Sequence, residues 1–178
     1  LLAKGRKMAV DVLISQEKIA ERVAEIGALI NSEYAGKELV VIGILNGACL
    51  FTADLIRQIN VPITLEFMSV SSYGEATKSS GNVKINLDCR NDIAGKHVLV
   101  VEDIVDTGLT MLKLRETLVG RGPASFKLAS LLFKPARNLH KVEINYLAFE
   151  IEDKFVIGYG LDYAGKYREL PYIGVYSE

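Results

Sequence analysis

"VLVVEDIVDTGLT", residues 98–110, decides the fold class of this chain. Its first four residues are apolar, as in strands buried on both faces of a sheet, and they run directly into Glu102 and Asp103. Asp106 follows three residues later, and helical spacing of apolar residues then runs over about 109–120. The stretch therefore predicts a buried strand, a turn that carries acids, and a helix.

The same alternation recurs along the rest of the chain. Strand-like apolar runs are expected at 38–45, 62–68, 83–87, 97–102, 126–133, 144–151 and 154–160. Helices are expected from a Ser15 cap to about Ile30, and through the apolar positions Cys49, Ala53, Ile56 and Ile59. Strands that alternate with helices predict an α/β fold with a central, mostly parallel sheet covered on both faces, whose ligands bind at the carboxyl ends of strands.

One long segment falls outside this alternation. Residues 69–82, "SVSSYGEATKSSGN", contain five serines and two glycines. A structureless segment of this length in a compact domain is usually functional. We expect it to be a mobile loop that closes over a site.

Composition excludes several classes of function. The chain has 178 residues, a net charge of −1 and a pI of about 6.2, so no overall positive field exists to attract nucleic acid or an anionic membrane. No apolar run approaches the ~18 residues that span a bilayer. Cys49, expected in the core, and Cys89 lack C-x-x-C spacing, which favours reduced thiols in a cytoplasmic protein. No repeat or linker is visible, so residues 1–178 are expected to form one domain.

The acids at the end of the buried strand need partners, because like charges this close repel unless they are hydrated, paired or bound to a cation. A helix that begins near Gly108 offers free backbone N–H groups to an anion, and Thr107 and Thr110 add hydroxyl donors. The carboxylates suit hydroxyl groups or Mg²⁺. The combination describes a sugar phosphate.

"VVEDIVDTGLT" resembles the phosphoribosyl diphosphate (PRPP) motif of type I phosphoribosyltransferases. Further segments are similar to the 6-oxopurine (hypoxanthine) branch of that family. "LNGACLFTADL" resembles its diphosphate-binding turn, "SVSSYG" its flexible loop, "ASLLFKPAR" its base-recognition lysine segment, and "EDKFVIGYGLDYAGKYRELPYIGVYSE" its C-terminal signature. The resemblance implies a core over roughly 36–150 and a small hood built from the two chain ends.

The resemblance also implies a reaction, in which hypoxanthine or guanine and PRPP give IMP or GMP and diphosphate with Mg²⁺. Asp106 would be the general base that accepts the proton from N7 of the purine. The remaining roles implied are as follows: Glu102 and Asp103 hold the ribose hydroxyls; Asp106, Thr107, Gly108, Leu109 and Thr110 cradle the 5′-phosphate; Lys134 donates to O6 of the base; Phe155 stacks on the purine; Val156 binds its edge through backbone atoms; Arg168 binds diphosphate; Ser72 and Tyr73 close over the site.

For the metal, the resemblance implies Asp162, with Glu102 and Asp103 nearby, as the residues that hold Mg²⁺. The chain departs from the family pattern at Asn46, in the diphosphate turn, where many members carry Lys. Gly47 is retained, so backbone contacts to diphosphate remain available while a cation is lost. The family also implies a homodimer or homotetramer.

Three other interpretations share some of these features. A receiver domain has acids and a Lys-Pro pair, but its acidic pair lies far ahead of the lysine, whereas Asp103 and Lys134 are only 31 positions apart. An aspartic protease uses D-T-G in an all-β setting, which the helical spacing after Gly108 contradicts. A PRPP-sensing regulator on the same fold is the main non-enzyme alternative, although the acidic pI does not favour nucleic-acid binding.

Overall fold

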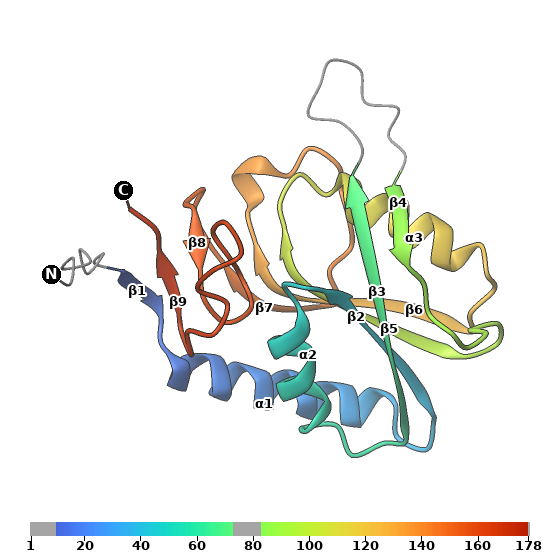
Figure 1. Cartoon of the computed structure of the whole chain (residues 1–178). Coiled ribbons are helices and arrows are strands. Elements are labelled where there is room, and N and C mark those ends of the chain that lie inside the picture. Colours follow the sequence, from blue (N-terminus) through green and yellow to red (C-terminus); the bar gives the residue numbers. More distant parts are fainter. Residues whose placement is uncertain (1–9, 73–82, 178) are drawn as a thin grey trace, which may run out of the picture.

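The computed structural model describes residues 10–72 and 83–177. A six-stranded sheet forms its centre (Figure 1), in the order β4 (Val83–Leu87), β3 (Ile63–Ser72), β2 (Leu39–Leu45), β5 (His97–Val105), β6 (Ser125–Phe133) and β7 (Tyr146–Glu150). Only the β3–β4 pair is antiparallel, and the other neighbours are parallel. The prediction of an α/β fold with a mostly parallel central sheet is confirmed.

Helices cover both faces of this sheet. α1 (Gln16–Glu33) and α2 (Cys49–Ile56) pack on one face with Leu39 and Val41 of β2, and α3 (Leu109–Val119) packs on the other with Val40 and Ile42. Successive side chains of a strand point to opposite faces, so a strand covered on both sides must be apolar throughout. This explains the continuous apolar runs of β2 and of Val98–Val101 in β5.

The helix predicted from Ser15 is confirmed. The Ser15 hydroxyl accepts a hydrogen bond from the Lys18 backbone N–H at 3.3 Å, and Glu17 lies in the first turn. The pKa of Glu17 is lowered by a backbone hydrogen bond and by Ser15. The helix continues to Glu33, one turn beyond the predicted end.

The predicted apolar face of α2 is wrong. Its buried residues are Phe51, Thr52 and Leu55, whereas Cys49 and Ala53 are exposed. The helix also ends at Ile56, before Ile59. Two turns of mostly apolar residues fit several faces equally well, so the periodicity of so short a segment does not select one.

Two strand boundaries also differ from those predicted. Ser69–Ser72 belong to β3 rather than to a loop, because Val70, Ser71 and Ser72 pair with β4. Tyr73 and the rest of the predicted loop to residue 82 lie outside the described residues. β5 extends to Val105, three residues beyond the predicted end at Glu102, so Asp103 also belongs to the strand.

The chain ends build a second, three-stranded antiparallel sheet beside the first (Figure 1), in the order β1 (Asp11–Ile14), β9 (Ile173–Val175) and β8 (Val156–Ile157). The strand predicted over 154–160 is short because Gly158 and Gly160 adopt positive φ angles of 95° and 99°. In the described part of the chain, no helix is long and apolar enough to cross a membrane.

Candidate active site

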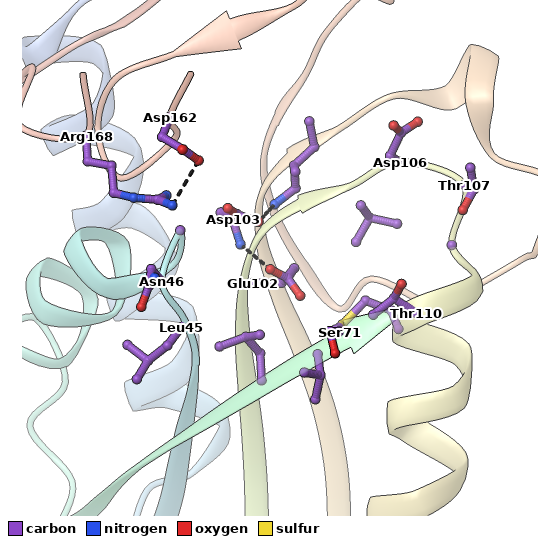
Figure 2. Close-up of a pocket in the computed structure, with 17 residues that line it drawn as sticks. Leu45, Asn46, Ser71, Glu102, Asp103, Asp106, Thr107, Thr110, Asp162 and Arg168 are labelled. Carbon is purple, nitrogen blue, oxygen red and sulfur yellow. Dashed lines mark hydrogen bonds and ion pairs between the residues drawn. The ribbon is translucent and has the colours of Figure 1, made fainter. Parts of the chain in front are cut away.

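A cleft of about 490 Å³ opens at the carboxyl ends of β2, β3 and β5. Of the described residues, those that line it are Ile44, Leu45, Asn46, Gly47, Val70, Ser71, Glu102, Asp103, Ile104, Val105, Asp106, Thr107, Gly108, Thr110, Met111, Asp162 and Arg168. Figure 2 shows Glu102 and Asp103 between the Asp162–Arg168 pair on one side and the turn from Asp106 to Thr110 on the other. Three segments predicted to form the site therefore meet in one cleft: the turn at Asn46 and Gly47, the stretch 102–110, and the C-terminal segment with Asp162 and Arg168.

The turn after β2 is held between two other parts of the chain. A β-carbon on Gly47 would lie 1.5 Å from Oδ2 of Asp103, and one on Gly160 would lie 2.1 Å from the Gly47 carbonyl oxygen. The Leu45–Asn46 peptide bond before this turn is cis. A side chain at either position would displace a neighbour, so Asp103 and Gly160 hold the backbone of this turn in place.

The two adjacent acids lie in different environments. Glu102 is buried, and its Oε1 accepts a hydrogen bond from the Asp103 backbone N–H at 2.9 Å. Asp103 is only half-buried, and its Oδ1 accepts from the Ile104 N–H at 2.6 Å. Burial, and then the negative charge of Asp103, raise the pKa of Glu102 well above its usual range. Burial therefore disfavours the charged form of Glu102, whereas Asp103 beside it is more accessible.

The turn between β5 and α3 presents backbone donors that side chains hardly occupy. Gly108 caps α3 with a φ of 85°, and no described side chain makes a cap hydrogen bond there, although Thr107 Oγ1 accepts a long one from the Leu109 N–H at 3.5 Å. A β-carbon on Gly108 would lie 2.1 Å from the His140 carbonyl oxygen, so glycine is required here. Free N–H groups at the start of a helix bind anions, and Thr107 and Thr110 add hydroxyl groups at the same place.

The opposite side of the cleft carries an ion pair. Arg168 lies 2.9 Å from Asp162, and the other oxygen of Asp162 accepts from the Gly165 N–H at 2.7 Å. Arg168 also donates to the Gly160 carbonyl oxygen, which ties it to the turn that covers Gly47. This arrangement places a guanidinium group, a good bidentate partner for phosphate, across the cleft from the start of α3.

Lys134, Phe155, Val156 and Leu109 do not line this cleft. Lys134 is nonetheless buried, and its ammonium group is 3.3 Å from Asp153, so it is not a solvated strand-end lysine. Phe155 is 52% exposed and contacts Tyr163 and Tyr176 edge to face, which leaves ring surface open for stacking.

Val156 has backbone groups available for a ligand. The Tyr176 N–H donates to the Phe155 carbonyl oxygen, so the next pair, Val156 with Val175, is a non-hydrogen-bonded pair of the antiparallel ladder. The N–H and C=O groups of Val156 consequently point away from β9, at the edge of the small sheet. Such an edge can hydrogen-bond a planar ring.

Sequence reasoning missed Arg137 and Asp153. Arg137 Nε donates to Asp106 Oδ1 at 2.6 Å, and a second nitrogen of Arg137 is 3.5 Å from Asp153. Both residues stand in segments that resemble the family, but an arginine 31 positions from an aspartate gives no sign of the pairing in the sequence. The fold alone brings them together.

The carboxylates of the cleft could hold a hard cation such as Mg²⁺ if substrate oxygens completed its coordination. Among residues 10–72 and 83–177, no group of three or more His, Cys, Asp or Glu side chains forms a ready metal site. Mg²⁺ is commonly held by one or two carboxylates together with substrate phosphates rather than by a protein cage. Asp162, Glu102 and Asp103 supply oxygen ligands of that kind around one cleft.

Comparison with known proteins agrees with this geometry. A family described as "Phosphoribosyl transferase domain" matches residues 10–164. Hypoxanthine phosphoribosyltransferase of Haemophilus influenzae is 49% identical over 95% of this chain and 96% of its own length. Hypoxanthine-guanine phosphoribosyltransferase of Streptococcus pneumoniae is 47% identical over 94% and 93%.

A solved structure shows the same fold. The crystal structure of a hypoxanthine-guanine phosphoribosyltransferase from Bacillus anthracis has a TM-score of 0.91 and 42% identity, and the match covers 96% of this chain and all of that one. The family match and these nearly end-to-end relatives show that the chain belongs to the phosphoribosyltransferase family.

Proposed function

We propose that this protein is a purine-salvage enzyme that transfers phosphoribose from PRPP to hypoxanthine and guanine. The observation that carries the proposal is the cleft itself, in which a buried strand delivers Glu102 and Asp103 beside the uncapped start of α3. Acids suit the hydroxyl groups of a pentose, and the helix start suits its 5′-phosphate. The names of relatives that align over nearly the whole chain supply the nature of the base.

The distribution of charge along the cleft suggests the orientation that we propose for PRPP. Its 5′-phosphate binds at the turn from Asp106 to Thr110, its hydroxyl groups face Glu102 and Asp103, and its diphosphate extends toward the backbone of Gly47 and toward Arg168. Asp162 and the neighbouring acids would hold Mg²⁺ together with substrate oxygens, and the ion would supply positive charge beside the diphosphate.

The purine binds outside the cleft proper, beside Asp106. Lys134 is buried and has one protein partner at 3.3 Å among the described residues, so it retains donors for the O6 atom of the base. Phe155 stacks on the ring, and the free backbone groups of Val156 hydrogen-bond its edge. The ammonium group of Lys134 donates only, so it suits a 6-oxo group and not the 6-amino group of adenine.

The chemical step exchanges one bond for another at the anomeric carbon. The bond from C1′ to the diphosphate oxygen breaks, a bond from N9 of the purine to C1′ forms, and Asp106 accepts the proton released at N7. Positive charge develops on the ribose ring as the bond breaks, and carboxylates beside the ring stabilise it. Asp106 Oδ1 is held by Arg137, while Oδ2 has no hydrogen-bond partner in the described part of the chain and is open to the base.

A panel of bases tests the proposal. Purified protein is incubated with PRPP, Mg²⁺ and hypoxanthine, guanine, xanthine or adenine, and the monophosphate product is measured. We expect IMP and GMP, with adenine unused and turnover lost when Mg²⁺ is chelated. PRPP-dependent binding to nucleic acid without any monophosphate would instead favour the regulator. Dependence on Mg²⁺, a homodimer or homotetramer, and a cytoplasmic location remain predictions.

A further inference from the structure

Four charged side chains form a continuous chain beside the cleft. Asp106 accepts from Arg137 Nε at 2.6 Å, Arg137 lies 3.5 Å from Asp153, and Asp153 lies 3.3 Å from the ammonium group of Lys134. The two ends of this chain are the groups to which the proposed function gives the proton of N7 and the O6 atom of the purine. The two central members, Arg137 and Asp153, have no other role in the proposed reaction.

The backbone around this chain is closely fixed. Lys134 N–H donates to the Val105 carbonyl oxygen at 3.1 Å, which extends the β5–β6 ladder to the residue before Asp106. The short 3₁₀ turn η1 (Pro135–Arg137) then returns Arg137 toward Asp106. Beyond it, the N–H groups of Leu139 and His140 both donate to the Thr107 carbonyl oxygen, at 3.1 and 2.9 Å.

The ion pairs contribute little to folding by themselves. The side chains of Arg137, Asp153 and Asp106 are 48%, 47% and 39% exposed, and ion pairs in such positions contribute little to stability because solvent screens them. A guanidinium group between two carboxylates does, however, restrict the rotamers of both, and it does so where the position of each carboxylate affects catalysis. These ion pairs therefore matter for the alignment of Asp106 and Lys134 rather than for the stability of the fold.

We infer that Arg137 and Asp153 are positioning residues that join the general base Asp106 to the O6 donor Lys134, so that one purine can meet both at once. Arg137 fixes one oxygen of Asp106 and leaves the other for N7. Asp153 fixes the buried ammonium group of Lys134 and leaves its remaining donors for O6. This inference rests on the proposed function, because it deepens the account of the same base subsite.

The main test replaces Arg137 by Gln, and separately Asp153 by Asn, in the full chain. We expect kcat/KM for hypoxanthine to fall about 10- to 100-fold in each, as small misplacements of reacting groups do. KM for PRPP should change less than twofold and the thermal midpoint should stay within about 2 °C, because the exposed pairs add little stability. Arg137→Lys keeps one cation near Asp106 and should recover part of the loss.

A matched control separates alignment from a general effect of surface charge. Lys113 forms a similarly exposed ion pair with Glu116 on α3, at 2.9 Å and away from the base, so Lys113→Gln should leave all kinetic constants unchanged. The double variant Arg137→Gln with Asp153→Asn should lose less than the product of the two single losses, because both act through one chain.

Two outcomes would overturn the inference. The first is a parent enzyme that turns over hypoxanthine while both single variants stay within twofold of it. The second is a loss that appears mainly in KM for PRPP or in the thermal midpoint, which would indicate a merely structural role. If the parent protein itself forms no IMP, the proposed function fails instead, and calorimetric binding of hypoxanthine to parent and variants in the presence of diphosphate still reports on the base subsite.

Discussion

Gly47 lies so close to Asp103 that a β-carbon on the glycine would be 1.5 Å from the carboxylate oxygen Oδ2. The carbonyl oxygen of Gly47 is also in close contact with Gly160, where an added β-carbon would lie 2.1 Å from it. The turn that carries Gly47, the strand end that carries Asp103 and the C-terminal segment that carries Gly160 therefore constrain one another. We expect a substitution in any one of these segments to shift the positions of the other two.

Replacing Gly47 by Ala tests this contact. The added methyl group must displace either Asp103 or the turn, so kcat/KM for PRPP should fall about 100-fold or more. Overpacking of this kind also costs about 1–3 kcal/mol of stability. Steady-state kinetics and thermal unfolding measure the two effects. Gly120→Ala is the control, because Gly120 has a helical φ of −61° and lies at the end of α3 away from the cleft; equal behaviour of the two variants would contradict the packing argument.

Replacing Asp106 by Asn should lower kcat about 10²- to 10⁴-fold, as loss of a general base usually does. The amide keeps the shape of the carboxylate and an oxygen for Arg137, so binding of PRPP should be nearly intact. Single-turnover kinetics and PRPP titration separate chemistry from binding. An unchanged rate would remove Asp106 from the proposed role.

Replacing Lys134 by Met should impair recognition of the oxo group. The O6 atom of a bound base would lose its donor, which costs roughly 1–3 kcal/mol, or about 5- to 150-fold in kcat/KM for hypoxanthine. KM for PRPP should change little, because Lys134 does not line the PRPP cleft. Efficient use of adenine by the parent enzyme would contradict the assignment of this lysine.

Replacing Glu102 by Gln should stabilise the free protein while it lowers activity. A carboxyl group whose pKa is raised on folding opposes folding once the pH exceeds its unfolded value, near 4.3. Stability of the parent should therefore fall as pH rises above about 4, and glutamine removes this dependence. Thermal midpoints should be higher for the variant at pH 7 and converge with the parent near pH 4, where each kcal/mol corresponds to roughly 2–4 °C.

The exposed residue Glu116 provides the control for that experiment, since Glu116→Gln removes a surface carboxyl group without touching the cleft. It should change the midpoint little at any pH. A Glu102→Gln midpoint that tracks the parent from pH 4 to pH 8 would show that the burial of Glu102 carries no energetic penalty.

Replacing Asn46 by Lys restores a cation that many family members carry in this turn. Asn46 is exposed and lines the cleft, so an ammonium group there can reach bound diphosphate. A gain of about 1 kcal/mol, roughly fivefold in affinity for PRPP, is expected at low ionic strength and should shrink as salt is added. Asn60→Lys adds the same charge before the start of β3 and should leave the affinity for PRPP unchanged. A similar gain in affinity there would show that the effect of Asn46→Lys comes from net charge and not from its position.

Local patterns predicted most of the core correctly. β2 and β5 are recognisable because burial on both faces demands unbroken apolar runs, and Ser15 is recognisable because a helix start needs a side-chain acceptor. The face of α2 was not predictable from two turns of mostly apolar residues. The serines at the end of β3 resemble a loop in composition, and only their pairing with β4 places them in the sheet.

The site was predictable where its residues are adjacent in sequence and not where folding brings them together. Residues 102–110 predict a sugar-phosphate site because acids, threonines and a glycine follow one buried strand. The pairing of Arg137 with Asp106, and the fit of Gly160 over Gly47, depend on which strands are neighbours in the sheet and how the C-terminal segment returns. Neither the periodicity nor the composition of the sequence predicts contacts between residues so far apart along the chain.

The small sheet also has a consequence for the order of folding. β8, which carries Val156, pairs with β9, and β9 in turn pairs with β1, so the small sheet joins strands that are more than 140 residues apart, whereas the large sheet joins strands between β2 and β7. A polypeptide made only as far as β7 contains every strand of the large sheet but lacks β8 and β9. We therefore expect the small sheet, and with it the edge that carries Val156, to form after the large one.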